Sequence, residues 1–197
     1  MRKYTKGIYI SLLALSISSC GTSDSDPEPT ILEGTWSTGC SGPDEDGEYS
    51  IEIDTYTGDK LTFTETIYGE DSTCTTESLI IDSTSTITLS DSYILGSGET
   101  VYDLNLSNAT FTLTPKSLGT VTELNSSSFC GHTSWEINVG KSMIGCDLDD
   151  DTISDIEADM FGIVEFNTTS IRYGIDVSTT IENRVTSLEQ IITFTKQ

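Results

Sequence analysis

The stretch YSIEIDTYTGDKLTFTETI, residues 49–67, contains two runs of alternating apolar and polar residues around a central Gly-Asp pair. Apolar side chains at every second position are typical of a strand with one buried face, and a turn pair between two such runs predicts a β-hairpin. Thr fills many of the polar positions, as suits the solvated face of a sheet. The stretch therefore predicts a β-fold for the surrounding chain.

The same period of two recurs along residues 31–197, which we expect to form a single all-β domain. Further strands are expected at Leu79–Ile81, Thr84–Ser90, Val101–Leu106, Ala109–Thr114, Ser134–Val139, Gly162–Phe166, Ser170–Ile175 and Ile191–Thr195. Short strands between Gly-, Asp- and Ser-rich turns predict an antiparallel up-and-down β-barrel, with a β-sandwich as the alternative. Apolar residues at 118, 121 and 124 predict one short helix, with Thr114 as its cap and Pro115 at its first position.

The N-terminal segment has the parts of an export leader. Residues 1–6 are basic and residues 7–17 form an apolar run that is too short to span a bilayer. Ile17-Ser18-Ser19-Cys20 resembles the lipobox of bacterial lipoproteins. That resemblance implies a signal peptide at 1–19 and an acylated Cys20 that anchors the chain to a membrane, and an ordinary secreted protein with a free Cys20 is the alternative. Residues 20–30 are then the lipidated cysteine and a flexible tether.

The composition limits the partners. The chain has 32 acidic and 9 basic residues, with a formal net charge of −23 at pH 7. Nucleic acid is excluded as a partner, because phosphate binding requires Lys and Arg, and the same charge disfavours docking of the folded domain on anionic lipid heads.

Four cysteines remain when Cys20 is set aside, an even number that suits an oxidising compartment. Three connectivities are open. We expect Cys40–Cys74 and Cys130–Cys146, because neighbours along a meandering chain pair most readily. A thiolate metal site is the alternative, but the cysteines lack the C-x-x-C spacing that is typical of one.

Gly34-Thr35-Trp36 resembles the Gly-x-Trp signature at the first strand of lipocalins and related calycin barrels. More broadly, the chain is similar to a group of uncharacterised lipocalin-like (calycin-like) lipoproteins of Gram-negative bacteria. The shared features are Gly34, Trp36 and Cys40, then Tyr68, Gly69 and Cys74, and then Phe129, Cys130, Gly131 and Trp135. The resemblance implies a lipocalin-like barrel, closed at one end by Trp36 under a late arginine, for which Arg172 is the first candidate and Arg184 the second. It also implies an outer-membrane location, since Gly21 follows the lipidated cysteine where Asp favours the inner membrane.

The interior of such a barrel is the expected binding site, with a small apolar ligand as the expected occupant. Phe63 and Glu65 are the candidate cavity residues, because Glu65 is in phase with Leu61, Phe63 and Ile67. An inward carboxylate needs a hydrogen bond, a counter-charge or a proton. The alternative is a bulge or edge position that exposes Glu65.

The acidic segment 146–159 is an incomplete calcium loop. Positions 1, 3, 5 and 9 of an EF-hand-type loop are matched by Asp147, Asp149, Asp151 and Asp155. Thr152 stands where that loop needs glycine, and Ala158 stands where it needs a bidentate glutamate. We therefore expect a solvated acidic loop and no cofactor, with a calcium site as the alternative.

Catalytic patterns are missing. His132 is the only histidine, and no nucleophile elbow, zinc-binding helix motif or phosphate loop accompanies it. We expect a cell-envelope binding module and not an enzyme. The alternative is an envelope interaction or adhesion protein with a filled β core and no ligand.

Overall fold

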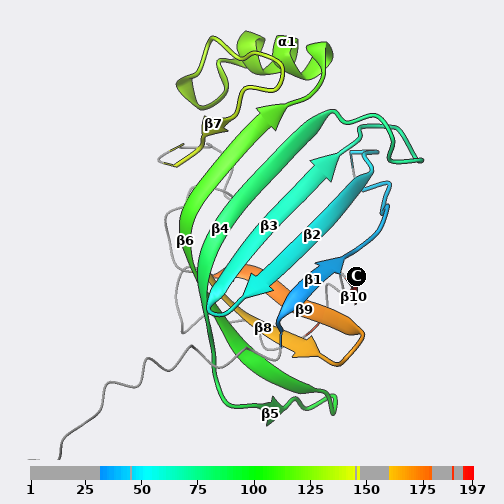
Figure 1. Ribbon diagram of the computed structural model, residues 1–197, viewed down its shortest axis with the longest axis vertical. Coiled ribbons are helices and arrows are strands. Elements are labelled where there is room, and N and C mark those ends of the chain that lie inside the picture. Colours follow the sequence, from blue (N-terminus) through cyan, green and yellow to red (C-terminus); the bar gives the residue numbers. More distant parts are fainter. Residues whose placement is uncertain (1–31, 45, 145, 147–159, 179–187, 189–192) are drawn as a thin grey trace, which may run out of the picture.

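The computed structural model describes residues 32–44, 46–144, 146, 160–178, 188 and 193–197. It contains the strands β1 (Gly34–Ser37), β2 (Ser50–Thr57), β3 (Lys60–Ile67), β4 (Leu79–Leu89), β5 (Tyr93–Ile94), β6 (Thr100–Pro115), β7 (Lys141–Ser142), β8 (Met160–Phe166), β9 (Ser170–Ser178) and β10 (Thr193–Lys196). One helix, α1 (Leu118–Ser127), and the short 3₁₀ turn η1 (Phe129–Gly131) complete the described elements (Figure 1). Among these residues, none of the helices is long and apolar enough to cross a membrane.

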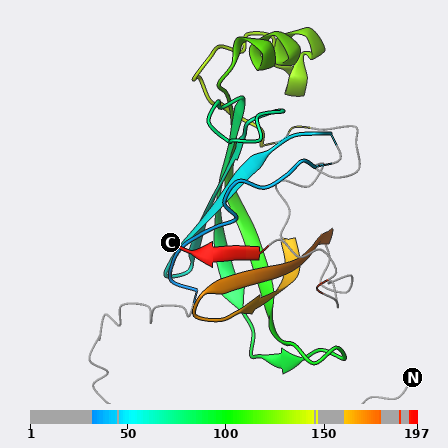
Figure 2. The ribbon, with the colours of Figure 1, turned by 90° about the vertical axis from the view of Figure 1, so that its right-hand side faces the viewer.

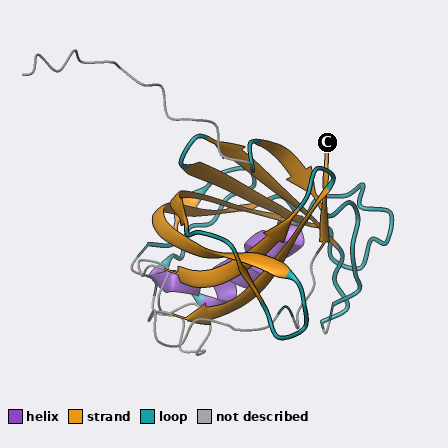
Figure 3. Cartoon of the chain, turned by 90° about the horizontal axis from the view of Figure 1, so that it is seen from below, coloured by secondary structure: helices purple, strands orange, loops and turns teal. Residues whose placement is uncertain are grey.

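Eight of the strands close into an antiparallel barrel. Following the hydrogen bonds gives the order β4, β3, β2, β1, β10, β9, β8 and β6, and β6 then pairs back with β4. Neighbours in the ring therefore follow one another along the chain, and the first strand, β1, pairs with the last, β10. The predicted up-and-down barrel is confirmed, and the sandwich alternative is wrong. Figure 3 looks along the barrel from below, with the helix at the far end.

Strands β4 and β6 are longer than expected. Each merges two predicted strands, and together they form eleven register pairs with one bulge between Thr84 and Ser85. The bulge keeps both long strands in one ladder while bending them around the barrel. Strand β6 pairs with β8 along one half and with the short β7 near its end, so it reaches beyond the ring toward α1 (Figures 1 and 2).

Two local predictions are wrong. The expected strand Ser134–Val139 is irregular, because Asn138 adopts a left-handed φ of 62° and the amide of Val139 turns back to the carbonyl of Glu136. The helix begins after Ser117, whose hydroxyl accepts a hydrogen bond from the amide of Thr120. The predicted cap Thr114 instead belongs to the end of β6, together with Pro115.

Residues 117–144, together with Cys146, form a cap beside the end of β6. Leu124 of the helix, Trp135 and Met143 pack with Leu113 of β6 in a second hydrophobic cluster. The disulfide Cys130–Cys146 fastens the cap, with its Cα atoms 5.1 Å apart. The second disulfide, Cys40–Cys74, joins the segments that follow β1 and β3, with a Cα separation of 5.9 Å. Both bridges have the predicted connectivity.

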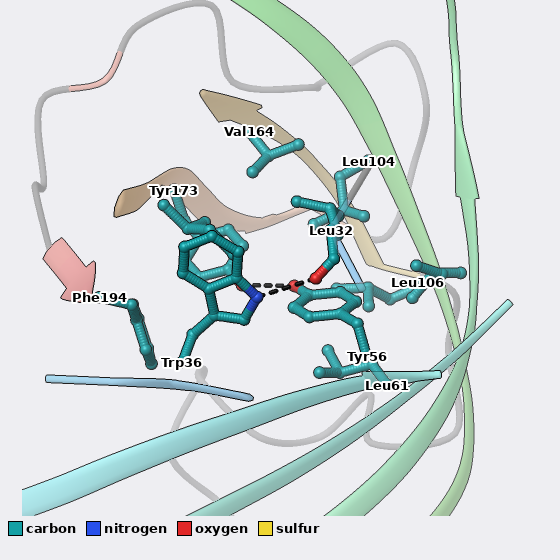
Figure 4. Packing of buried hydrophobic residues seen from close by; sticks show 11 residues of the cluster. Leu32, Trp36, Tyr56, Leu61, Leu104, Leu106, Val164, Tyr173 and Phe194 are labelled. Atoms are coloured by element: carbon teal, nitrogen blue, oxygen red, sulfur yellow. Dashed lines mark hydrogen bonds between the residues drawn. The ribbon is translucent and has the colours of Figure 1, made fainter. Parts of the chain in front are cut away.

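The main core fills one end of the barrel, which we call the closed end. It contains Leu32, Trp36, Tyr56, Leu61, Ile87, Leu104, Leu106, Val164, Ile171, Tyr173 and Phe194 (Figure 4). These side chains come from β1, β2, β3, β4, β6, β8, β9 and β10 and from Leu32, two residues before β1, so every strand of the ring contributes to the packing. The hydrophobic burial of this layer is the main term that stabilises the ring.

Candidate functional site

Trp36 lies at the centre of the closed end. Its side chain is 1% exposed, and its Nε1 donates a 2.8 Å hydrogen bond to the carbonyl of Leu32 (Figure 4). The Nζ of Lys196 lies 5.1 Å from the centroid of the indole ring. Gly34 has a φ of 124°, and a Cβ there would lie 3.0 Å from Cε of Lys196. The positive φ therefore favours glycine at this position, and a larger residue would also displace the end of the lysine side chain.

The cation over Trp36 is Lys196, so the prediction of Arg172 in that position is corrected. Strand β9 directs Ile171 and Tyr173 into the core, and the alternation of a strand places Arg172 on the outer face. There it forms an ion pair with Glu165, its register partner on β8. The second candidate, Arg184, lies outside the described residues.

A chain of three polar groups joins opposite strands of the barrel, with its two tyrosines in the core of the closed end. The hydroxyl of Tyr173 donates a 2.6 Å hydrogen bond to Oδ2 of Asp54, and the hydroxyls of Tyr56 and Tyr173 are hydrogen-bonded to each other. Since Tyr173 uses its single proton on Asp54, Tyr56 must be the donor to Tyr173. The chain therefore runs from Tyr56 through Tyr173 to the carboxylate.

Burial controls the protonation of all three groups. It raises the pKa of Asp54 to about 6, against the hydrogen bond from Tyr173, which lowers the pKa. Burial also raises the pKa values of Tyr56 and Tyr173, so both phenols stay neutral. Asp54 is 3% exposed, and its second oxygen, Oδ1, has no hydrogen-bond partner among the described residues. An acceptor of this kind costs about 1 to 3 kcal/mol, and more when it is charged, unless a donor reaches it.

Two further carboxylates share this inner face. Glu52 lies two residues before Asp54 on β2 and is the register partner of Glu65 on β3. Burial, followed by the charges of Glu65 and Asp54, raises the pKa of Glu52 to about 7. Burial also raises the pKa of Glu65, while a hydrogen bond with Ser50 lowers it. Like charges opposite each other on neighbouring strands are destabilising unless something neutralises them.

The predicted cavity residues Phe63 and Glu65 do point inward. Both β2–β3 and β3–β4 keep their register through these residues, so no bulge turns Glu65 outward. Phe63, Glu65 and the inward-facing Phe111 of β6 are only half-buried, in contrast to the filled closed end. The interior thus changes from fully buried to half-buried along its length, and Phe111 also packs against the second hydrophobic cluster under the cap. We call this half-buried end the open end.

The rim near Glu48 is acidic as well. Burial raises the pKa of Glu48, and the nearby charges of Asp44, Asp46 and Glu123 raise it further. These residues come from the segment between β1 and β2 and from α1. Segments far apart in the sequence therefore add negative potential around Glu48, which in turn raises the pKa of Glu65 inside.

The calcium-loop candidates Asp147, Asp149, Asp151 and Asp155 lie outside the described residues. Within the part of the chain that the structure describes, no three His, Cys, Asp or Glu side chains are grouped closely enough to hold a metal ion.

The sequence patterns did not identify four residues of this site, namely Asp54, Glu52, Tyr56 and Tyr173. The alternation of residues 49–54, taken alone, favours Ile51 and Ile53 for the interior, whereas the structure places Glu52, Asp54 and Tyr56 there. The length of the turn was the overlooked signal. A two-residue turn at Gly58-Asp59 pairs Asp54 with Phe63, and the two then share a face.

The chain matches no protein-family model, and its sequence matches no curated protein.

Proposed function

We propose that this chain is a lipid-anchored protein of the bacterial cell envelope whose barrel binds a small molecule at its open end. The observation that carries the proposal is the half-buried state of Phe63, Glu65 and Phe111, which point inward beyond a filled closed end. Binding sites for small molecules combine apolar walls with a few polar groups that orient the ligand. Two aromatic rings beside a small number of carboxylates fit that description.

The location rests on the leader and on Cys20. A basic and apolar N-terminus followed by Ile17-Ser18-Ser19-Cys20 supports export and acylation, and Gly21 supports the outer membrane of a Gram-negative bacterium. Two disulfides in the folded chain suit an oxidising compartment. The role is binding, and no catalytic residue is part of the proposal.

Native mass spectrometry of the full chain, purified in mild detergent from its own envelope, tests the binding function. We expect a bound small-molecule mass that is lost on unfolding. The substitution Ser83→Trp should remove that mass, because Ser83 is a half-buried inward residue in register with Phe63 and Phe111. Thr86→Trp, an exposed position on the same strand, is the matched control and should retain it. An empty wild-type protein, or equal masses in both variants, would contradict the proposal.

Cys20→Ala tests the anchor. The substitution should release the chain from the membrane fraction, because the acyl groups that hold it there need the thiol. Ser23→Ala, three residues later in the tether, should leave the chain in the membrane fraction. Fractionation with immunoblotting measures both variants, and a Cys20→Ala chain that stays with the membrane would refute lipidation at this site.

The alternative, an interaction protein, draws support from one observation. Leu118, Ile137, Val139 and Ile144 are 69%, 43%, 45% and 41% exposed, and all four belong to the cap that follows β6. Exposed large apolar residues mark interaction sites when they form a patch. If the wild-type protein is empty in the mass spectrum, this role becomes the better supported one.

A further inference from the structure

Asp54 has a buried carboxylate oxygen that can accept a further hydrogen bond. Its carboxyl group is 3% exposed, one oxygen is held by Tyr173, and the other has no hydrogen-bond partner among the described residues. A buried polar atom without a partner is rare in folded proteins and calls for an explanation. Strand alternation places Asp54 on the same inner face as Glu52, and its register partner there is Phe63. The unpartnered atom is therefore a buried acceptor on a side chain of the inner face, next to residues of the open end.

The charges around Asp54 are all of one sign. Glu52 and Glu65 face each other across β2 and β3, and their side chains are within contact distance in such a pair. Glu48, Asp44 and Asp46 add negative charge at the rim. Several carboxylates with partial burial attract a cation far more strongly than exposed ones, because the low dielectric of the interior screens the attraction less.

The described basic residues are committed elsewhere. Lys116 pairs with Glu77, and Arg172 pairs with Glu165 on the outer face. Lys196 lies over Trp36 at the closed end, while Lys141 lies over Trp135 in the cap. Lys60 is exposed at the first position of β3, at the closed-end turn between β2 and β3. In the described part of the chain, the three inner carboxylates therefore have no ion pair with a basic side chain.

The surroundings favour an organic cation over a metal ion. The described carboxylates do not converge as a metal-binding group of three, and two half-buried aromatic rings, Phe63 and Phe111, lie on the same inner face. Aromatic faces attract ammonium groups and also pack against apolar carbon. A metal ion would gain little from them.

We infer that the open end binds an organic amine, whose N–H group donates to Oδ1 of Asp54 and whose positive charge lies near Glu52 and Glu65. The apolar part of the amine packs against Phe63 and Phe111. This inference rests on the proposed binding function and specifies the chemical class of the ligand. The ligand is thus a cation with an apolar portion, whereas the sequence alone led us to expect an apolar molecule.

Three size-matched probes test the inference. Phenethylamine is a cation at pH 8, 2-phenylethanol is neutral and phenylacetate is an anion, while their aromatic parts are the same. Isothermal titration calorimetry of the full chain at fixed salt should give an affinity for the amine about tenfold or more above that for the alcohol, as expected for a charge-assisted hydrogen bond. Phenylacetate should not bind.

Substitutions at the carboxylates locate the site. Asp54→Asn should weaken phenethylamine binding about tenfold or more, because it removes the charge while keeping an acceptor for Tyr173. The double variant Glu52→Gln/Glu65→Gln tests the half-buried pair independently and should weaken binding several-fold. Asp59→Asn, an exposed position in the β2–β3 turn, removes the same charge elsewhere and should bind like the wild type.

The outcomes separate the two proposals. The inference is overturned if 2-phenylethanol or phenylacetate binds as tightly as phenethylamine. It is also overturned if phenethylamine still binds both Asp54→Asn and the Glu52→Gln/Glu65→Gln variant like the wild type. In either case the barrel is still a binding module. Displacement of the amine by an equivalent amount of calcium also overturns it, in favour of a metal site. If none of the probes binds and the purified protein carries no ligand mass, both the inference and the proposed function fail.

Discussion

Replacement of Trp36 by alanine is expected to lower the free energy of unfolding by about 3 to 5 kcal/mol. The side chain is 1% exposed at the centre of the closed end, so its removal leaves a cavity that strands from the whole ring cannot fill. The loss also removes the hydrogen bond to Leu32 and the contact with Lys196. Urea unfolding followed by circular dichroism measures the change.

Two further variants serve as controls for the Trp36→Ala substitution. Trp36→Phe keeps an aromatic ring but loses the Nε1 donor, so it should cost clearly less than the alanine substitution. Ile94→Ala on β5 removes a side chain that is 72% exposed and should change the stability by no more than about 0.5 kcal/mol. A Trp36→Ala protein within about 1 kcal/mol of the wild type would show that the indole does not hold the ring together.

Acidification from pH 8 to pH 5 should stabilise the fold, by on the order of 2 to 4 kcal/mol. The pKa of Glu52 is raised from 4.5 to about 7, and that of Asp54 is raised from 3.8 to about 6. The folded state therefore binds protons more tightly than the unfolded state between about pH 4 and pH 7. The stabilisation is complete below the unfolded pKa values and is lost as the pH rises through the folded ones.

Asp71 has the opposite dependence of stability on pH, but it titrates below the range of pH 5 to 8. Hydrogen bonds from Thr73 and Thr75 lower the pKa of Asp71, so its contribution to stability is lost only as the pH falls well below 4. The melting temperature measured across pH 5 to 8 checks the prediction. The double variant Glu52→Gln/Asp54→Asn should flatten the profile, whereas Asp59→Asn should retain the slope. Stability that decreases from pH 8 to pH 5, or the same slope in the double variant, would contradict the assignment.

The barrel was predictable because its strands carry local information. The alternation in residues 49–67 and the turn at Gly58-Asp59 are sufficient for the hairpin, and the expected pairing of neighbouring cysteines agrees with both disulfides. The lengths of β4 and β6 were not predictable in the same way. Their continuity depends on a bulge between Thr84 and Ser85, and neither residue type predicts a bulge.

The site could be predicted only in part. Glu65 and Phe63 were found because they share the phase of Leu61, but Asp54 was assigned no role although it is the partner of Phe63. Its contact with Tyr173 joins residues 119 positions apart, and no local pattern reports such a pairing. The position of Lys196, and not Arg172, over Trp36 was unpredictable for the same reason. It depends on the long-range pairing of β1 with β10, which places Lys196 opposite Trp36.

The pairing of β1 with β10 determines when the barrel is complete. The hydroxyl of Thr195 donates a hydrogen bond to the carbonyl of Ser37, which lies 158 residues earlier in the chain. The two strands share only two register pairs, Trp36–Lys196 and Ser37–Thr195. Until β10 is in place, the seven other strands of the ring form a curved open sheet with two unpaired edges, a form prone to intermolecular pairing. We therefore expect the shortest pairing of the ring to form last, after the strands that precede β10 in the chain have paired with one another.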